Sequence, residues 1–203
     1  MITIIDYGMG NLGSIANMLK RIGYTCEICA DADKIEKAKK IILPGVGHFD
    51  KAMENLVKLG LIETIKIKAL QDKTPILGIC LGMQLMCKSS EEGTRQGLGL
   101  IDAVVKRFNF SHNNIKIPHM GWNIASPKKD SKLFTNHDID TRFYFVHSYY
   151  VVCNETNDTL TTTHHGLEFT SSFEHNNIIG VQFHPEKSHR FGMELLKNFV
   201  KKY

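Results

Sequence analysis

A cysteine stands between two glycines in Gly78-Ile-Cys80-Leu-Gly82, where an apolar run gives way to a helical pattern. This is the Gly-x-nucleophile-x-Gly pattern of a nucleophile elbow, in which a strand turns tightly into a helix and holds the nucleophile in a strained conformation. The N-terminal end of a helix also favours thiolate over thiol. Cys80 is therefore a candidate nucleophile, and an inert buried cysteine is the alternative.

A second stretch, His184-Pro185-Glu186, follows the apolar run at residues 178–183. Side chains two apart in an extended segment point the same way, and Pro185 favours extended backbone at His184. The two Cα atoms should lie ~6.5 Å apart, so Glu186 can reach one imidazole nitrogen and leave the other free. With Cys80 this predicts a Cys-His-Glu triad, in which Glu186 fixes the tautomer and His184 moves the thiol proton to a leaving amine. A surface hydrogen bond is the alternative reading of an isolated His-x-Glu.

A thiolate that attacks a carboxamide or ester creates a tetrahedral oxyanion, which requires hydrogen-bond donors. The amide of Leu81, at the start of the helix, is one candidate donor. The loop Gly45-Val46-Gly47, after the neighbouring strand, offers further N–H groups that side chains do not shield. Taken alone, this loop could equally be a tight turn. Gln84, one helical turn beyond Cys80, should face the same pocket as a substrate-binding amide or a satisfied polar residue.

The first half of the chain alternates short apolar runs with helical patterns, and its predicted strands are 2–5, 25–30, 40–43 and 75–79. Four strand-then-helix units imply a parallel sheet with helices on both faces, and function should collect at the C-terminal ends of its strands. The second half holds short β-branched or aromatic runs at 101–108, 143–153, 159–165, 169–175 and 178–183. These runs predict hairpins in an antiparallel extension. The fold class is thus α/β, in one domain over residues 1–203, closed by an amphipathic helix at 191–202.

A rival signal lies near the N-terminus, where Gly8-x-Gly10-x-x-Gly13 stands between a strand and a helix. Its spacing and context match the dinucleotide-binding fingerprint, with Glu27 or Asp31 about twenty residues later. A nucleotide-binding domain is therefore the alternative of another class. It would leave Cys80, His184 and Glu186 without a role.

Composition describes an ordinary globular protein of 203 residues with a net charge of +4, spread between 25 Lys/Arg and 21 Asp/Glu. No basic block is present, so we expect no nucleic-acid partner. No signal-peptide pattern or membrane-length apolar run is seen, which predicts a cytoplasmic protein with no membrane association. Five cysteines then indicate reduced thiols, and the lone Cys26-x-x-Cys29 lies in a strand that sends the two side chains to opposite faces, so no metal site is expected.

Taken together, these stretches resemble the class I (triad) glutamine amidotransferases, which hydrolyse glutamine and pass ammonia to a synthase. Within that family the chain is most similar to the glutaminase subunits of imidazole glycerol phosphate synthases. The resemblance spans nearly the whole chain in the right order, and the segments that carry it are Asp6–Leu12, Leu43–Gly47, Gly78–Gln84, Pro118–Asn123, Phe143–Tyr149 and Gln182–Ser188.

The resemblance implies a class I glutamine amidotransferase-like (flavodoxin-like) fold, with glutamine as substrate and no cofactor. Cys80 would form a glutamyl thioester, in a pocket lined by Gly47, Leu81, Gln84, Glu92, Ser148 and Tyr149. A (β/α)8 cyclase subunit would bind as the partner in a heterodimer, facing Asn11, Trp122, Lys187 and Tyr144 or a neighbouring aromatic. Ammonia would pass into that barrel and yield imidazole glycerol phosphate and AICAR in histidine biosynthesis. The resemblance also implies that the isolated glutaminase is nearly silent and that a backbone N–H of the loop, here that of Val46, turns toward the oxyanion on activation.

Two departures from that pattern matter. Gly13 stands where the family more often has a larger side chain, which completes the rival glycine spacing. Lys187–Met193 and Thr163–Phe169 resemble a side branch that supplies ammonia for surface-polysaccharide sugars, so that branch is an alternative pathway with the same triad. An inactive binding module and a stand-alone thiol hydrolase of the same fold are further alternatives.

Overall fold

The structure is a computed structural model that describes residues 1–110, 115–135 and 141–203. Over these residues the main sheet has eleven strands in the order β2-β1-β3-β4-β13-β12-β10-β6-β5, with β11 beside β12 and β8 beside β11. A separate two-stranded sheet pairs β7 with β9. The strands are β1 (Ile2–Ile5), β2 (Cys26–Cys29), β3 (Lys40–Leu43), β4 (Ile76–Ile79), β5 (Ser89–Ser90), β6 (Ala103–Arg107), β7 (His119–Ile124), β8 (Ser126–Pro127), β9 (Arg142–His147), β10 (Tyr149–Cys153), β11 (Thr159–His164), β12 (Glu168–His175) and β13 (Ile178–Val181).

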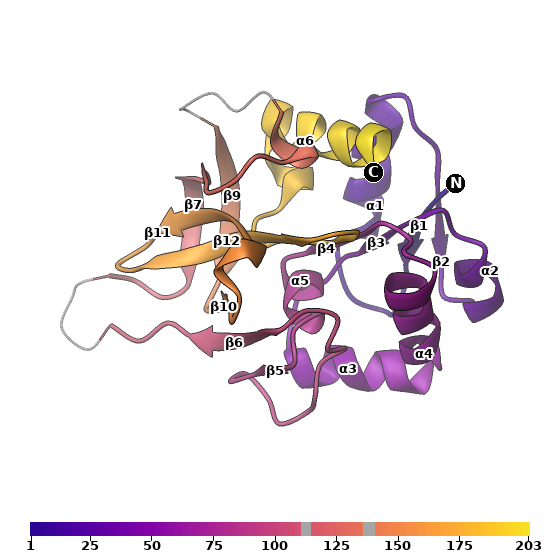
Figure 1. Cartoon of the computed structure of the whole chain (residues 1–203), viewed down its shortest axis with the longest axis horizontal. Coiled ribbons are helices and arrows are strands. Elements are labelled where there is room, and N and C mark those ends of the chain that lie inside the picture. The colour runs from indigo at the N-terminus through magenta and orange to yellow at the C-terminus, as the bar shows by residue number, and fades with distance from the viewer. Residues whose placement is uncertain (111–114, 136–140) are drawn as a thin grey trace.

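Helices cover both faces of the parallel part of the sheet, with α1 and α6 above it and α3, α4 and α5 below it in Figure 1. No helix among the described residues is long and apolar enough to cross a membrane. The helices are α1 (Leu12–Arg21), α2 (Ala32–Glu36), α3 (Phe49–Lys58), α4 (Leu61–Lys66), α5 (Leu81–Leu85) and α6 (His189–Lys202). Four short helical turns are also found among the described residues: η1 (Ile67–Gln71), η2 (Lys132–Phe134), η3 (Thr156–Asp158) and η4 (Pro185–Lys187).

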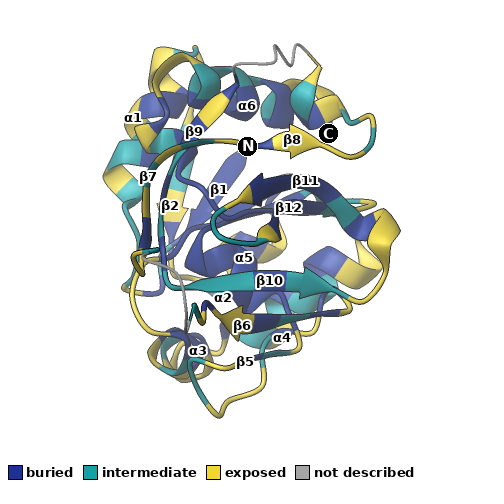
Figure 2. Ribbon diagram, turned by 90° about the vertical axis from the view of Figure 1, so that its left-hand side faces the viewer, coloured by how far each residue is buried: buried dark blue, intermediate teal, exposed yellow. Residues whose placement is uncertain are grey.

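The core divides into two layers because successive side chains of a strand point to opposite faces. In β1, Ile4 belongs to the cluster under α1 and α6, while Ile5 belongs to the cluster under α3 and α4. Ile41 and Ile42 of β3 divide in the same way. The central strands are therefore apolar on both faces, as expected for a parallel sheet covered by helices, and Figure 2 shows them buried beneath their helices.

The α/β class, the parallel strands β1 to β4 and the antiparallel extension are confirmed. The prediction for β13 is wrong in part, because this strand pairs with β12 antiparallel but with β4 parallel. The chain returns from the extension into the edge of the parallel sheet, so β13 becomes its fifth parallel strand. The expected run 143–153 also divides at Ser148, since β9 pairs with β7 and β10 pairs with β6.

Candidate active site

Cys80 occupies the turn between β4 and α5, at the C-terminal edge of the parallel sheet. Its backbone has φ 54° and ψ −110°, a conformation that residues other than glycine rarely adopt. The flanking glycines are required because neighbouring backbone segments approach them too closely to admit a Cβ. A Cβ at Gly78 would lie 2.8 Å from backbone atoms of Gly82, and a Cβ at Gly82 would collide with the carbonyl oxygen of Leu43. The elbow thus holds a strained, 7% exposed thiol above the sheet.

The parallel pairing of β13 with β4 brings His184 to the cysteine. Val181 aligns with Ile79, so the residues that follow these two strands emerge side by side. The Cys80 N–H donates to the Val181 carbonyl at 2.8 Å, and the His184 N–H donates to the Tyr144 carbonyl at 2.9 Å. His184 is therefore anchored to both sheets at the mouth of the elbow.

His184 Nδ1 lies 2.8 Å from Glu186 Oε1, and both side chains are 1% exposed. His184 has the extended backbone that Pro185 predicts, with φ −103° and ψ 96°. The expectation that the segment stays extended as far as Glu186 is wrong, because Pro185–Lys187 form a 3-10 turn directly after His184. The turn brings the carboxylate back to the imidazole by chain curvature instead of by strand alternation. Burial lowers the pKa of His184, but the adjacent Cys80 and the Glu186 carboxylate, which accepts its hydrogen bond, outweigh burial and raise this pKa to about 10. The site therefore stabilises the imidazolium that forms when His184 accepts the thiol proton.

The other imidazole nitrogen, His184 Nε2, is buried and has no hydrogen-bond partner among the described residues. An unpaired buried polar atom is costly unless a reacting group uses it. With Nδ1 held by the carboxylate, Nε2 is free to exchange a proton with the thiol and with a leaving group.

Two residues of the predicted triad, Cys80 and His184, line a cavity of about 410 Å³. Every residue that the sequence predicts for substrate binding lines this cavity, together with Cys80, His184 and part of the glycine loop. The lining residues are Val46, Gly47, Cys80, Leu81, Gln84, Glu92, Val146, His147, Ser148, Tyr149, His184 and Lys187. Its size and its mixture of apolar walls with a few polar groups suit a small amino acid.

One of the predicted oxyanion donors, the Leu81 N–H, is already hydrogen-bonded in this structure. The Leu81 N–H donates to the Gly45 carbonyl at 3.3 Å, so that carbonyl lies where an oxyanion would be stabilised. The loop is held from below by the buried Tyr7 hydroxyl, which donates to the Pro44 carbonyl at 2.6 Å. Burial, and next the nearby Cys80, raise the pKa of Tyr7, which keeps the phenol protonated and able to donate. Val46, between the two glycines, is 42% exposed.

Gln182, two residues before His184 and directly after β13, has no role predicted from the sequence. Its Nε2 donates to the Cys80 sulfur at 3.7 Å, and its Oε1 accepts a hydrogen bond from Gln84 Nε2 at 3.0 Å. Gln84 Nε2 also donates to the Tyr149 carbonyl at 3.2 Å. The two amides therefore connect the nucleophile to the wall of the pocket. The two-residue spacing between Gln182 and His184 was the signal that could have revealed Gln182.

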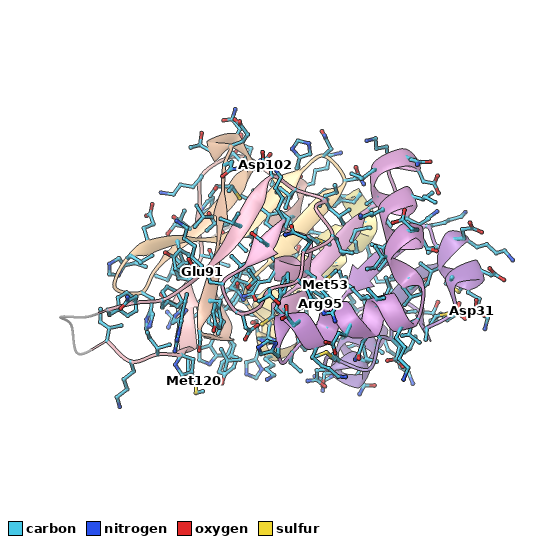
Figure 3. All side chains as sticks on the ribbon, turned by 90° about the horizontal axis from the view of Figure 1, so that it is seen from below. Asp31, Met53, Glu91, Arg95, Asp102 and Met120 are labelled. Carbon is cyan, nitrogen blue, oxygen red and sulfur yellow. The ribbon has the colours of Figure 1, made fainter. Side chains whose placement is uncertain are left out.

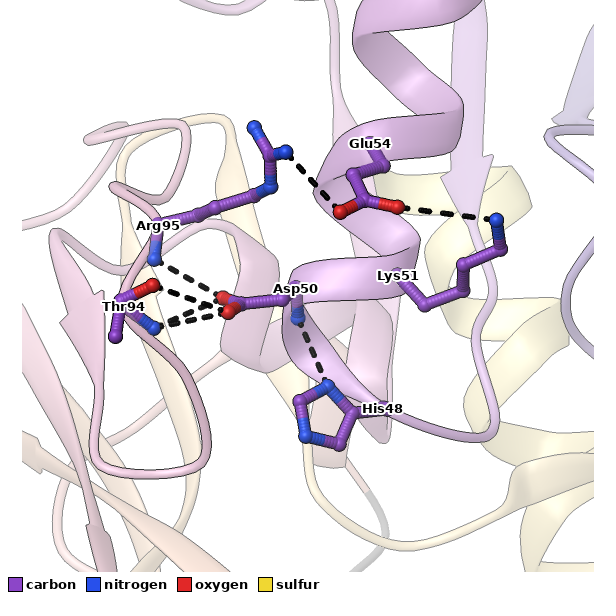
Figure 4. Close-up of polar contacts among 6 residues, drawn as sticks. All are labelled: His48, Asp50, Lys51, Glu54, Thr94 and Arg95. Carbon is purple, nitrogen blue, oxygen red and sulfur yellow. Dashed lines mark hydrogen bonds and ion pairs between the residues drawn. The ribbon is translucent and has the colours of Figure 1, made fainter.

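Glu92 is positioned by a loop that is clamped to the start of α3 (Figure 4). The Phe49 N–H donates to Glu92 Oε2 at 2.9 Å. The Asp50 carboxylate accepts the N–H groups of Thr94 and Arg95 at 3.0 to 3.1 Å, and these bonds hold its pKa below the usual value. Since α3 follows Gly47 after one residue, His48, the clamp joins the glycine loop to the acidic side of the pocket.

The rival loop at Gly8–Gly13 is filled by the protein itself. A Cβ at Gly10 would meet Pro44 at 3.1 Å and the Gly45 N–H at 3.3 Å, so the glycine admits a neighbouring backbone where a pyrophosphate would have to lie. Asn11 begins α1 and accepts a hydrogen bond from the Ser14 hydroxyl at 2.9 Å. This packing favours a supporting role for the loop over dinucleotide binding.

One surface next to the site is aromatic and exposed. On β7, Met120, Trp122 and Ile124 are 62%, 43% and 43% exposed, and Figure 3 shows Met120 at the edge of the molecule. The Trp122 ring stacks on His189 at 5.5 Å between centroids and meets Tyr144 edge-on at 6.3 Å. Lys187, which lines the cavity, places its ammonium 5.6 Å from the Tyr144 ring.

The chain matches the family model for glutamine amidotransferase class-I over residues 3–203. It therefore belongs to this family of enzymes. Among named relatives, it is 56% identical over 201 residues to imidazole glycerol phosphate synthase subunit HisH 2 of Methanococcus maripaludis, with 99% of each chain covered. It is 46% identical over 200 residues to the subunit HisH 2 of Pseudomonas aeruginosa, with 98% of each chain covered.

Solved structures agree on the fold at low identity. A glutamine amidotransferase structure superposes with a TM-score of 0.74 at 16% identity and covers 99% of this chain and 98% of its own. A glutamine amidotransferase from Thermotoga maritima gives a TM-score of 0.64 at 20% identity, with 100% of this chain and 81% of that chain covered. The predicted class I glutamine amidotransferase fold is confirmed.

Proposed function

We propose that this chain is the glutaminase subunit of an imidazole glycerol phosphate synthase, in which it hydrolyses glutamine and passes ammonia to a cyclase subunit in the cytoplasm. The observation that carries the chemistry is His184, with Glu186 on one nitrogen and its other nitrogen free beside a strained cysteine. Full-length relatives at 56% and 46% identity that are named as subunits of that synthase support the particular reaction.

The residues divide the reaction into two acyl transfers. His184 Nε2 takes the Cys80 proton, and the thiolate adds to the carboxamide carbon of glutamine. His184 then protonates the leaving nitrogen, the C–N bond breaks, and ammonia departs from a glutamyl thioester. Water, deprotonated by the same imidazole, attacks the thioester carbon and releases glutamate with the thiol restored. Glu186 keeps the imidazole oriented and stabilises its charge at each stage.

Glu92, Gln84, Ser148 and Tyr149 line the cavity and would hold the amino-acid end of glutamine. Glu92 supplies the negative charge that complements an α-ammonium group, and it approaches the pocket already hydrogen-bonded to the Phe49 N–H. The pocket therefore favours an amino acid over an uncharged amide.

The conformation of the glycine loop, Gly45-Val46-Gly47, would make glutamine hydrolysis depend on a partner. While the Gly45 carbonyl accepts the Leu81 N–H, the tetrahedral intermediate lacks a donor pair. Rotation of the Gly45–Val46 peptide would free the Leu81 N–H and turn the Val46 N–H toward the substrate. The exposed surface around Trp122, with Lys187 between it and the cavity, is the candidate docking site for a (β/α)8 cyclase subunit, and Asn11 would lie toward the same partner.

The test is glutamate release from glutamine, measured for the chain alone and with a cyclase subunit and its ribotide substrate. We expect low activity alone, a large rise in the complex, and a loss of about 10³-fold or more in Cys80→Ser. Full activity of the isolated chain would contradict the loop mechanism, and an undiminished Cys80→Ser variant would contradict the triad. A rise only with a polysaccharide-locus synthase would keep the glutaminase and move the pathway to the alternative branch.

A further inference from the structure

Strand β7 has two faces with different chemistry. Met120, Trp122 and Ile124 point outward and are exposed, whereas His119 on the opposite face is 4% exposed. Strand β7 pairs edge to edge with β9, and in that pairing His119 aligns with His147, a residue that lines the glutamine cavity. The pair His119 and His147 therefore connects β7 to the wall of the pocket.

A chain of hydrogen bonds connects β7 to the pocket wall, and every donor in it points toward the pocket. Asn123 Oδ1 accepts the Ile124 N–H at 2.8 Å and its Nδ2 donates to the His164 carbonyl at 2.9 Å, which fixes the amide orientation. The same Nδ2 lies 3.1 Å from His119 Nε2, which must therefore accept. His119 then carries its proton on Nδ1.

The ring of His147 is constrained in the same way. His119 Nδ1 lies 3.0 Å from His147 Nε2, so His147 accepts there and carries its own proton on Nδ1. That nitrogen is 2.7 Å from the Tyr149 carbonyl. Both imidazoles are thus neutral, each with one donor and one acceptor in use.

The surroundings favour these neutral forms. Burial, and next the charge of His165, lower the pKa of His119 to about 4. Burial likewise lowers the pKa of His147 to about 3 against the opposing hydrogen bond to Tyr149, and His119, His165 and His184 lower it further. Rings of Phe145 and Phe169 complete the packing around the two imidazoles. No proton is gained near pH 7, so the direction of the hydrogen bonds is stable.

The Tyr149 carbonyl is a shared acceptor. It accepts hydrogen bonds from His147 Nδ1 at 2.7 Å and from Gln84 Nε2 at 3.2 Å. Gln84 in turn bonds Gln182, whose amide donates to the Cys80 sulfur. The hydrogen bonds therefore run without a break from Asn123 to the nucleophile.

We propose that His119 and His147 are positioning residues of the glutaminase, which hold the Tyr149 carbonyl, and through Gln84 and Gln182 the Cys80 thiol, in register with strand β7. The proposal rests on the proposed function, because it assigns these residues to the same pocket. Neither histidine touches the reacting atoms. His147 acts through the Tyr149 carbonyl, which also accepts the Gln84 amide, and His119 acts through His147.

The test compares glutamine hydrolysis by the assembled complex of the full chain and its cyclase partner. His119→Phe keeps an aromatic ring but removes both hydrogen bonds, and we expect kcat/KM for glutamine to fall about three- to tenfold. His119→Asn retains a donor near the Nδ1 position and should recover most of that loss. His165→Phe is the matched control, since the His165 ring stacks on His119 at 4.3 Å between centroids, and its one side-chain hydrogen bond to the described residues is to the Lys116 carbonyl. It should stay within twofold of the wild type.

Two measurements on the isolated chain separate this proposal from the proposed function. Nitrogen NMR at pH 7 should show both rings neutral with the proton on Nδ1, and iodoacetamide labelling of Cys80, followed by mass spectrometry, should change rate in His119→Phe. A charged ring, an Nε2–H tautomer, an unchanged His119→Phe variant or an equal loss in His165→Phe would overturn the proposal. If the wild-type complex releases no glutamate, the proposed function fails, and the tautomer and labelling rate alone decide the positioning role.

Discussion

At the scale of single residues, the thiol of Cys80 is presented by a strained backbone. Cys80 has φ 54° in a region where a Cβ is strained, at a cost of about 1–3 kcal/mol. Gly78 and Gly82 admit the turn but do not relieve Cys80 itself. The fold tolerates this strain because the turn is fixed on one side by β4 and on the other by α5.

We therefore predict that Cys80→Gly is more stable than Cys80→Ala, although both remove the thiol. Relief of strain should exceed the extra unfolded-state entropy of glycine, about 0.4–1 kcal/mol, and leave a net gain of about 1 kcal/mol. Thermal unfolding would detect this as a difference of about 2–4 °C in Tm. Equal Tm values, or a more stable alanine variant, would show that the elbow stores no such strain.

At the scale of elements, the approach of α5 to the end of β3 depends on a missing side chain. A Cβ at Gly82 would collide with the Leu43 carbonyl oxygen, whereas a Cβ at Gly13, near the start of α1, meets no atom within 4 Å. The two glycines occupy similar positions in their helices, so they form a matched pair.

Gly82→Ala should lower the free energy of unfolding by at least about 2 kcal/mol, because backbone atoms must shift to admit the methyl group. Gly13→Ala should instead raise it by up to about 1 kcal/mol through helix propensity. Urea unfolding of both variants checks the pair. A mild effect at Gly82 would mean that α5 can move away from the sheet without loss.

The clamp between α3 and the 91–95 loop belongs to the same scale. In Asp50→Asn, a single amide oxygen replaces the two carboxylate oxygens that accept the Thr94 and Arg95 N–H groups. We expect the KM for glutamine to rise about three- to tenfold with kcat within twofold, because Glu92 loses its fixed position. Steady-state kinetics of the complex measure this split.

Glu54→Gln is the control for that prediction. Glu54 bonds the side chain of Arg95 at 3.0 Å and lies in the same cluster, but it does not hold the loop backbone (Figure 4). Its KM should match the wild type. An equal rise in both variants would assign the effect to charge alone and remove the positioning role of Asp50.

At the scale of the whole molecule, the buried histidines make stability depend on pH. His119 and His147 stay neutral in the folded chain down to pH about 4 and about 3, while unfolded histidine binds a proton near pH 6.5. The unfolded state therefore binds more protons below pH 6.5, and stability falls as the pH falls. His184 acts in another window, because its raised pKa gives stability that is lost as the pH rises from about 6.5 to about 10.

We predict that the free energy of unfolding decreases from pH 7 to pH 5, with up to about 1.4 kcal/mol per pH unit from each buried histidine. His119→Phe should have a shallower slope than the wild type over this range, where carboxylates remain charged. Urea unfolding at several pH values supplies both slopes. A slope that is unchanged in the variant would show that His119 protonates as easily in the folded chain as in the unfolded one.

The sequence by itself determined the local chemistry of this protein. Glycines around Cys80 predicted the elbow because close backbone approach demands them, and apolar runs predicted the parallel strands because both faces of such strands are buried. The pairing of His184 with Glu186 also followed from a two-residue spacing, although the backbone that achieves it is a turn.

Only the tertiary structure decided what depends on neighbours far apart in the chain. The parallel entry of β13 beside β4 placed Gln182 on the Cys80 sulfur, the glycine loop set its carbonyl against the Leu81 N–H, and β7 brought His119 to His147. Local spacing carries no information about such contacts, because strand order and the hydrogen-bond partners of a loop are fixed by packing across the whole sheet.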